Sequence, residues 1–373
     1  MFDVIVIGGN LAGATAVINA AEKGVNVALV ERHKKPFSPA HCGEGIADVT
    51  AELLKLDNIN CPKNEIKLVQ MTVSTIKEYS FKLKTHKIFV INRNYLENSL
   101  LEKARQQGAT LFLGVGMKDF KAPNEVILDT GVTIRGKVII DASGIACQVG
   151  RRLGLNTYLK PSDIGVCIQS RVQSSFDSHI QKMWFHSPYA PFGYAWVFPK
   201  SDTLANIGLG VPGGKKIDVE ALLKSYIHFI TGGNYKVVST FHSCVPSGLP
   251  LHPLVKDNVM FIGDAARLVD AATGAGIHHA VCSGSLAGRI AAKYIRGELP
   301  SLNMYQLEMQ NKISQLSRRY YNKIKLTTDQ QYVSAYKRAW SLLSFLNKIA
   351  PNFFQEYVAK VLRKDIVILE RYR

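Results

Sequence analysis

The chain has 373 residues, of which 47% are hydrophobic, so it can form two connected domains with an appendage and is not a disordered chain. Its 46 Lys and Arg outnumber its 29 Asp and Glu, and the net charge of +17 favours an anionic partner: a phospholipid surface, nucleic acid or an acidic substrate. A source whose proteins are all basic would give the same charge. Because no zinc finger, basic zipper or RNA-binding signature accompanies it, we expect no nucleic acid partner.

The cysteines and the apolar segments indicate the compartment. Six cysteines are scattered without the spacing of a disulfide framework or a zinc site, which indicates a reducing environment and no metal. The chain starts on an apolar strand, and no apolar run reaches about eighteen residues, so we expect neither a signal peptide nor a membrane span. The expected location is the cytoplasm, with peripheral contact at a membrane surface as an addition.

The first thirty-one residues predict a βαβ unit that binds a dinucleotide. An apolar strand at 2–7 enters the turn Gly8-Gly9-Asn10-Leu11-Ala12-Gly13, an Ala-rich helix runs through Lys23, and a strand at 25–30 ends at Glu31. Such a turn points backbone N–H groups and the positive end of a helix at a pyrophosphate. Glu31 lies 31 − 13 = 18 residues past Gly13, where an acidic side chain accepts hydrogen bonds from a ribose.

Asn10 stands where the G-x-G-x-x-G fingerprint has its middle glycine. A Cβ at this position takes room from the diphosphate. We expect the turn to form because Asn tolerates left-handed dihedral angles. Taken alone, the motif leaves open an ordinary Gly-rich turn without a ligand.

The next segments predict a ligand loop and a second sheet. Cys42-Gly43-Glu44-Gly45 follows a Pro-rich stretch and favours backbone held closely around a ligand, although a plain surface loop has the same spacing. Strands at 67–74, 78–83 and 87–91 would begin the second sheet, and a helix is expected over 93–107.

The middle of the chain returns to the first sheet. We expect a strand at 110–115, a hairpin at 125–128 and 132–134, and a buried strand at 137–140 that delivers Asp141-Ala142-Ser143-Gly144 into a turn. Backbone in this turn could meet the cofactor. Asp141 as a simple turn residue is the alternative.

Residues 164–210 predict β-structure with three aromatic rings on one face. Tyr194, Trp196 and Phe198 alternate along a strand, so their side chains share one side. Such rings form either a core layer, which is commoner, or the wall of an apolar ligand site.

A strand at 259–262 leads to Gly263-Asp264-Ala265, and Thr273-Gly274-Ala275-Gly276-Ile277 opens a helix over 278–294. Asp264 could bind a ribityl hydroxyl. The N–H groups of Gly276 and Ile277 would face an anionic edge, and the N1–C2=O edge of a flavin suits the dipole of this helix.

The last segment is basic and helical. From 311 to 373 there are thirteen Lys and Arg and four Asp and Glu, a net charge of 13 − 4 = +9, together with aromatic and leucine side chains. This pattern is typical of helices that lie on an anionic membrane. A helical cap with a solvated basic face is equally compatible with it.

Taken together, residues 1–300 resemble the geranylgeranyl reductase flavoproteins, within the p-hydroxybenzoate-hydroxylase-like FAD superfamily. The resemblance rests on the Gly8–Gly13 turn with Glu31, on Cys42-Gly43-Glu44-Gly45, on Arg93 with Leu96, on Asp141–Gly144, on Tyr194-x-Trp196-x-Phe198-Pro199, on Gly263-Asp264-Ala265-Ala266-Arg267 and on Thr273-Gly274-x-Gly276-Ile277. The chain departs from the family at Asn10 and at Ala271, where a proline is usual.

The resemblance implies an FAD enzyme that saturates C=C bonds of geranylgeranyl chains in membrane lipids or their precursors, by hydride transfer from flavin N5. The residues predicted to contact FAD are Gly8, Gly9, Ala12, Gly13, Glu31, Arg32, Cys42, Gly43, Gly45, Arg93, Val115, Asp141, Gly144, Asp264, Gly274, Gly276 and Ile277. Tyr194, Trp196, Phe198 and Pro199 are predicted to face the isoprenoid substrate. The resemblance therefore favours a ligand wall over a core layer for the three rings.

The chemistry needs a dry site and a proton donor, because an isolated alkene is a poor electrophile. His41, Cys42 and Tyr194 are the candidates, beside a bound water, and we favour Cys42 as a thiol that only contacts the cofactor. No second dinucleotide fingerprint appears, so the reductant stays open among NAD(P)H, ferredoxin and another reduced carrier, with an electron-donor protein as one option.

The predicted fold class is α/β: a Rossmann-like FAD-binding domain, an inserted and mainly antiparallel substrate sheet, and a helical C-terminal segment. The expected domains are 1–64 with 92–160 and 255–300 for FAD, 65–91 with 161–254 for the substrate, and the basic helical segment 301–373.

Three alternatives stay open. A flavin monooxygenase or halogenase would share every FAD motif. A relative of electron-transfer flavoprotein dehydrogenases would do so as well, but the sequence lacks a ferredoxin-like cysteine cluster. A binding protein with a degenerate FAD fold is motivated by Asn10 and Ala271.

Overall fold

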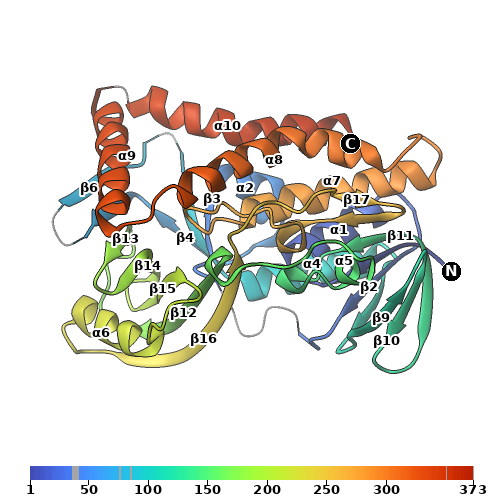
Figure 1. The fold of residues 1–373 in the computed structure, drawn as a ribbon, viewed down its shortest axis with the longest axis horizontal. Coiled ribbons are helices and arrows are strands. Elements are labelled where there is room, and N and C mark those ends of the chain that lie inside the picture. The colour runs from blue at the N-terminus through green and yellow to red at the C-terminus, as the bar shows by residue number, and fades with distance from the viewer. Residues whose placement is uncertain (36–41, 75–76, 85, 350, 373) are drawn as a thin grey trace.

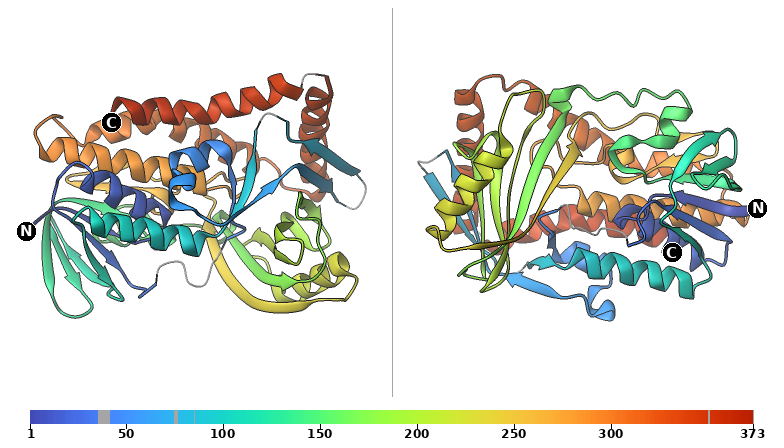
Figure 2. Two further views of the ribbon diagram at one scale, coloured as in Figure 1. Left: turned by 180° about the vertical axis from the view of Figure 1, so that it is seen from behind. Right: turned by 90° about the horizontal axis from the view of Figure 1, so that it is seen from below.

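The structure, a computed structural model, describes residues 1–35, 42–74, 77–84, 86–349 and 351–372. Two large sheets lie toward opposite ends of the long axis (Figure 1). Views from behind and from below show the C-terminal helices along one side of both sheets (Figure 2). The predicted α/β class, with a Rossmann-like domain, an antiparallel sheet and a helical C-terminus, is confirmed.

The first sheet is built around the N-terminal strand. Its strand order is β17-β18-β11-β1-β2-β8, with β10 and β9 attached to β11. The bounds are β1 (Phe2–Ile7), β2 (Val27–Glu31), β8 (Thr110–Leu113), β9 (Met117–Lys121), β10 (Glu125–Leu128), β11 (Thr133–Asp141), β17 (Val255–Lys256) and β18 (Val259–Phe261). β1 runs parallel to both β2 and β11, and Ile7 is opposite both Val30 and Asp141. The Gly8 turn, Glu31 and Asp141 therefore lie at one edge, where ligands of such sheets bind.

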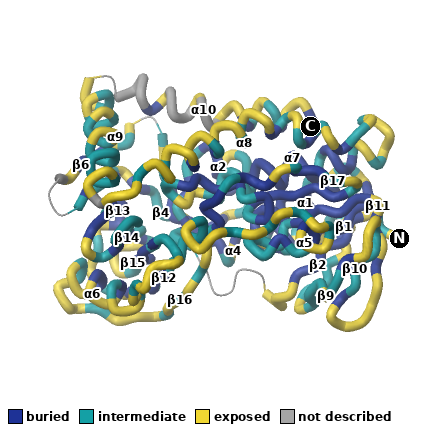
Figure 3. The backbone as a smooth tube through the Cα atoms, viewed as in Figure 1, coloured by how far each residue is buried: buried dark blue, intermediate teal, exposed yellow. Residues whose placement is uncertain are grey.

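Three helices pack on this sheet or on one another: α1 (Leu11–Ala21), α4 (Arg93–Gln106) and α7 (Ile277–Ile295). α1 and α7 approach closely, because a Cβ at Gly284 would lie 2.1 Å from the Ala12 carbonyl oxygen and one at Gly288 would lie 2.3 Å from that of Ala16. Small residues at this crossing bury the helix of the nucleotide turn (Figure 3). Shorter elements complete the domain: α2 (Asp48–Leu53), α3 (Leu56–Ile59), α5 (Gln148–Arg152) and the 3-10 turns Gly144–Ala146, Pro161–Asp163 and Gly263–Ala266.

The second sheet has the order β16-β12-β15-β14-β13-β5-β6, and β13 with β5 is its parallel pair. The bounds are β5 (Leu68–Val73), β6 (Lys77–Lys82), β12 (Ile164–Gln173), β13 (Ile180–Ser187), β14 (Ala190–Ser201), β15 (Leu204–Pro212) and β16 (Lys236–Pro246). Helix α6 (Val219–Thr231) buries Leu223, Tyr226 and Ile227 in the core it shares with strands of this sheet.

Two expectations about strands are wrong. The segment expected at 87–91 forms β7 (Ile88–Ile91) of a separate sheet with β3 (Gly45–Ala47) and β4 (Lys63–Ile66), because it pairs with the strand that begins at the last residue of Cys42-Gly43-Glu44-Gly45, here called the cysteine loop. The two strands expected at 132–134 and 137–140 form the single strand β11, which pairs antiparallel with β10 in its first half and parallel with β1 in its second. The three-part division into domains stays a prediction.

The C-terminal segment consists of α8 (Asn303–Ile324), α9 (Asp329–Ile349) and α10 (Pro351–Arg371). α8 and α10 contact α7, while α9 contacts β5, β6 and β13 of the second sheet. The segment thus joins the two sheets along one side of the molecule (Figure 1). Of the helices in the described ranges, none has the length and apolar content needed to cross a bilayer.

Candidate active site

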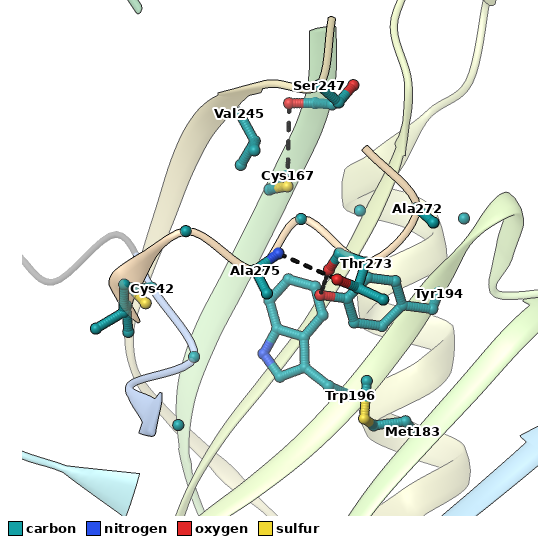
Figure 4. A pocket seen from close by; sticks show the side chains of 18 of the residues that line it. Cys42, Cys167, Met183, Tyr194, Trp196, Val245, Ser247, Ala272, Thr273 and Ala275 are labelled. Carbon is teal, nitrogen blue, oxygen red and sulfur yellow. Dashed lines mark hydrogen bonds between the residues drawn. The ribbon is translucent and has the colours of Figure 1, made fainter. Parts of the chain in front are cut away.

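A cavity of about 490 Å³ lies where the loops of the first sheet meet the second sheet. Its lining is mostly apolar and comes from Cys42–Ala47, from 271–278, from strands β12 to β16, and from Lys323, Tyr332 and Tyr336 of the C-terminal helices. Figure 4 shows Cys42, Tyr194, Trp196 and Thr273 around it. This size is in the range of small-molecule and cofactor sites.

The nucleotide turn is too crowded for side chains at two of its glycines. Gly8 has φ +105°, and a Cβ there would lie 2.3 Å from the Ala142 carbonyl oxygen. At Gly13 a Cβ would lie 1.8 Å from the Gly8 carbonyl oxygen. Asn10 has φ −72° and ψ −177° and is exposed, so the expectation that it uses its tolerance of left-handed angles is wrong. The extended conformation is open to any residue, and Asn10 therefore does not strain the turn.

Glu31 holds the turn from the neighbouring strand. One oxygen of its buried carboxylate accepts the Gly9 N–H at 2.7 Å, and the other accepts the His33 N–H at 2.8 Å. Arg32 follows it, and Val115 donates its N–H to the Glu31 carbonyl at 3.0 Å. Glu31, Arg32 and Val115 are thus brought together at the end of β2, beside the turn. Their contacts with the adenosine half of FAD stay predictions.

Asp141 organises the second turn. Its buried carboxylate accepts the N–H groups of Ser143, Val149 and Gly150 at 2.9 to 3.2 Å. Gly144 has φ +71°, in the left-handed region. Because three amides occupy the Asp141 side chain, a cofactor contact here would come from the turn backbone.

Asp264 faces the first turn of α7 from the 3-10 turn that follows β18. Burial raises the pKa of this carboxyl, and the nearby Arg93 opposes the shift. Among the described residues we find no hydrogen bond to its carboxylate. A Cβ at Gly276 would lie 3.6 Å from one Asp264 oxygen, so the glycine keeps the space above Asp264 open. Ala12 packs beside it, against Gly263, which joins the nucleotide turn to this end of the site.

The loop that precedes α7 is held by Asp270. The Asp270 carboxylate accepts the N–H groups of Ala272 and Thr273 at 2.9 and 3.2 Å and pairs with Arg319 of α8. Gly274 has φ +68°, and Ile277 is the first residue of α7. The buried Asp264 carboxylate, which accepts no hydrogen bond from the described residues, is free to bind a hydroxyl, so the residues present fit FAD.

The Cys42–Gly45 loop is clamped between the two sheets by the fully buried Glu44, which has φ +68°. Its carboxylate accepts the Arg93 N–H at 2.9 Å, Arg171 at 3.0 Å, Lys200 at 2.5 Å and Asn206 at 2.8 Å. Burial lowers the pKa of Lys200, and Glu44 opposes this shift. One side chain therefore links the start of α4 to strands β12, β14 and β15.

Cys42 lies at the start of this loop and lines the cavity. Its sulfur accepts the Glu44 N–H at 3.3 Å and interacts with the guanidinium of Arg93. Arg93 is itself buried and donates from Nε to Glu97 at 3.2 Å. The structure thus brings Cys42, Gly43, Gly45 and Arg93 together. His41 lies outside the described residues.

Three rings of β14 form one wall of the cavity, as Figure 4 shows for Tyr194 and Trp196. Tyr194 donates its hydroxyl to the Thr273 carbonyl at 2.8 Å, and burial raises its pKa. Trp196 donates to Gln169 at 3.0 Å, and Gln169 donates to the Cys42 carbonyl at 2.9 Å. Tyr194 therefore holds the loop at Thr273, and Trp196 holds the loop at Cys42 through Gln169.

The ring of Phe198 leaves little room for side chains at the two glycines of the cysteine loop. A Cβ at Gly43 would lie 2.7 Å from its ring, and one at Gly45 would lie 3.2 Å from it. Pro199 lies on the other face of β14, because successive side chains of a strand point to opposite faces. It does not line the cavity, and its carbonyl accepts a hydrogen bond from Asn64 at 2.9 Å. The position of Pro199 therefore gives no support to the predicted substrate contact.

Sequence reasoning missed the partners of the cysteine loop: Gln169, Arg171, Lys200 and Asn206. Glu44 between two glycines was a visible signal, but we assigned it no role. Gln169 and Arg171 are two residues apart on β12, so their alternation could have indicated a polar face aimed at the loop.

Comparisons with known proteins match two segments of the chain to protein families. Residues 163–245 match the family profile of the geranylgeranyl reductase catalytic domain, and residues 3–75 match that of an FAD binding domain. The chain is 31% identical to a digeranylgeranylglycerophospholipid reductase of Methanocella arvoryzae, over 83% of this chain and 82% of that protein. It is 30% identical to digeranylgeranylglycerophospholipid reductase 2 of Methanothermobacter thermautotrophicus, over 84% of both chains.

Solved structures share the fold. A geranylgeranyl bacteriochlorophyll reductase-like protein of Thermoplasma acidophilum superposes with a TM-score of 0.81 at 23% identity, over 99% of both chains. A flavin-dependent brominase gives a TM-score of 0.68 at 18% identity, over 97% of this chain and 99% of that one. The fold alone therefore does not separate reductases from halogenases.

The Glu44 clamp predicts a large effect of an isosteric substitution. Glu44→Gln keeps the shape but leaves Arg171 and Lys200 without their anion, so we expect the free energy of unfolding to fall by about 3–5 kcal/mol. Glu65→Gln breaks the exposed ion pair with Lys87 and should cost about 1 kcal/mol or less. Urea unfolding of both variants tests this, and equal losses would contradict it.

Proposed function

Because this chain belongs to the geranylgeranyl reductase family of FAD-dependent oxidoreductases, we propose that it saturates C=C bonds of geranylgeranyl chains in membrane lipids or their precursors. The observation that carries the proposal is the mostly apolar cavity between the FAD loops and the aromatic face of β14. The matched catalytic profile at 163–245 covers β12 to β15 of this wall. The flavin-dependent brominase described above resembles this chain in fold, at 18% identity, and so gives no support for a halogenase function.

Reduced FAD, when bound, supplies the hydride of this reaction. The Gly8–Gly13 turn and Glu31 would hold the nucleotide, and Asp264 would accept a ribityl hydroxyl. The first-turn N–H groups of α7 at Gly276 and Ile277 would stabilise negative charge at the flavin edge, because they have no partner within the helix. Tyr194, Trp196 and Phe198 exclude water from the alkene.

For the proton, the contacts favour Cys42 over Tyr194. The Cys42 sulfur lines the cavity and interacts with the guanidinium of Arg93, so it is positioned to reach an alkene bound there. The Tyr194 hydroxyl is already bound to Thr273, and its raised pKa makes it the weaker acid. We infer that Cys42 delivers the proton, which goes beyond the contact role that we favoured from the sequence.

The reductant reaches the enzyme from outside the chain. NAD(P)H, ferredoxin and another reduced carrier are the classes that could supply two electrons, and an electron-donor protein would bind only for this step. No residue is assigned to it.

Helix α9 carries the features of a membrane-contacting surface. Leu342, Phe345 and Ile349 are 58%, 61% and 63% exposed and lie at spacings of three and four residues, so they share one helix face. Tyr332 and Tyr336 of the same helix line the cavity. We infer peripheral contact with an anionic bilayer, which would bring the lipid surface within about one helix diameter, roughly 10–12 Å, of the site.

The function is tested by the mass of the product. The FAD-loaded protein, reduced with dithionite without oxygen and given a digeranylgeranylglycerophospholipid, should raise the mass of the lipid in steps of about 2 Da, one for each double bond saturated. Mass spectrometry provides the measurement. Unchanged lipid with tightly bound flavin, and peroxide formation with NADH in air, would favour an oxygenase instead.

The role of Cys42 predicts a rate effect without loss of cofactor. Cys42→Ser should lower kcat for lipid reduction by about 10²- to 10⁴-fold, because a hydroxyl is a much weaker acid than a thiol. Flavin absorbance should stay unchanged. Cys244→Ser, at an exposed cysteine outside the cavity, is the control. A Cys42→Ser enzyme as fast as this control would rule out Cys42 as the proton donor.

The membrane face predicts a binding change. Replacing Leu342, Phe345 and Ile349 with Ser removes apolar area from the exposed face and should reduce co-sedimentation with anionic phosphatidylglycerol vesicles at least about tenfold. Reduction of a detergent-dispersed lipid should stay near the wild-type rate. Replacement of Val237 and Val238 by Ser, exposed on β16, is the matched control. Loss of vesicle binding in both variants alike would contradict a specific α9 face.

A further inference from the structure

The apolar cavity has one cationic end. Lys323, from the last turn of α8, and Ser247, just after β16, both line it. We propose that Lys323 and Ser247 bind the phosphate of the isoprenoid substrate and so set its direction in the cavity. This inference rests on the proposed function, because it takes the substrate to be a prenyl chain with an anionic head.

Among the described residues, Lys323 makes a hydrogen bond and not an ion pair. Its ammonium nitrogen donates to the Ser247 hydroxyl at 3.2 Å. Across the described ranges, Lys323 has no ion pair with a carboxylate within 4.0 Å. The nearby carboxylates have other partners: Asp163 accepts the Tyr320 hydroxyl at 3.1 Å, and Asp270 pairs with Arg319.

Burial lowers the pKa of Lys323, while Asp163 and Asp270 raise it. An ammonium taken out of water without a paired anion is costly, and a phosphate oxygen would restore the lost interaction. Lysine binds phosphate as a point charge with three donors, and the Ser247 hydroxyl can act as a further donor once a phosphate replaces its present acceptor. Ser247 at present donates to the Asp163 carbonyl at 3.2 Å.

The position of Lys323 and Ser247 in the cavity suits a prenyl chain that carries a phosphate head group. In Figure 4, Val245 and Ser247 lie at one end of the site and Met183 at the other, with Cys42, Tyr194 and Trp196 between them. A phosphate at Lys323 would therefore direct the prenyl chain past the cysteine loop and along the aromatic wall. Lys323 also lies one short connection before α9, so the head of the substrate would be next to the helix that we place at the membrane.

The test compares two ligands that differ only in the head: geranylgeranyl phosphate and geranylgeraniol. Their dissociation constants are measured on the FAD-loaded enzyme from the change in flavin absorbance or in tryptophan fluorescence. We expect wild type to prefer the phosphate by about 10- to 100-fold. Lys323→Gln should lose this preference while still binding the alcohol as wild type does.

Two variants complete the comparison. Lys325→Gln removes an exposed charge two residues away and should keep the wild-type preference. Lys323→Arg should restore it, and its unfolding midpoint beside that of Lys323→Gln separates a binding effect from a folding defect. The proposal is overturned if Lys323→Gln keeps the preference, or if Lys325→Gln loses as much.

Inorganic phosphate distinguishes a lipid head from a free anion. We expect it to compete with geranylgeranyl phosphate only at concentrations at least about 100-fold higher than the prenyl ligand needs. Equal potency would overturn the assignment to a lipid head and leave an anion site. If both prenyl ligands bind with the expected preference but neither is reduced, the proposed function fails while the phosphate site stands.

Discussion

The buried carboxylate of Glu44 is the interaction on which the site depends. It lies in the loop before β3 and accepts hydrogen bonds from Arg171, Lys200 and Asn206 of the second sheet and from the first amide of α4. A carboxylate without water is stable only with such partners. The position of Cys42 relative to both halves of the cavity is therefore determined by charge pairing rather than by the loop itself.

Packing reinforces this constraint. The ring of Phe198 lies against the loop so closely that Gly43 cannot carry a Cβ, and a Cβ at Gly208 would lie 2.4 Å from the ring of Trp196. Trp196, Gln169 and Cys42 form a chain of hydrogen bonds from the sheet to the loop. The rings that make the wall apolar therefore also hold the polar loops in place.

Several features of the site could be predicted from the local sequence alone. The crowding at Gly8 and Gly13 is a property of the βα turn, and the shared face of Tyr194, Trp196 and Phe198 follows from strand periodicity, so both could be predicted. The family resemblance identified the expected cofactor as FAD and the expected substrate as an isoprenoid. The sheet of β7, the extended backbone of Asn10 and the burial of Pro199 away from the cavity depend on tertiary pairing and exact register, which short motifs do not specify. The partners of Glu44 come from 49 to 162 residues away, and no local pattern connects them.

A crystal structure of the purified chain with FAD and a geranylgeranyl ligand would show whether Glu44 holds both halves of the site around the flavin and the prenyl chain. We expect the isoalloxazine ring between the Cys42–Gly45 loop and the first turn of α7, the prenyl chain against Tyr194 and Trp196, and Glu44 still bound to Arg171, Lys200 and Asn206. A flavin bound elsewhere, or a prenyl chain outside the cavity with Glu44 released from these partners, would contradict this expectation.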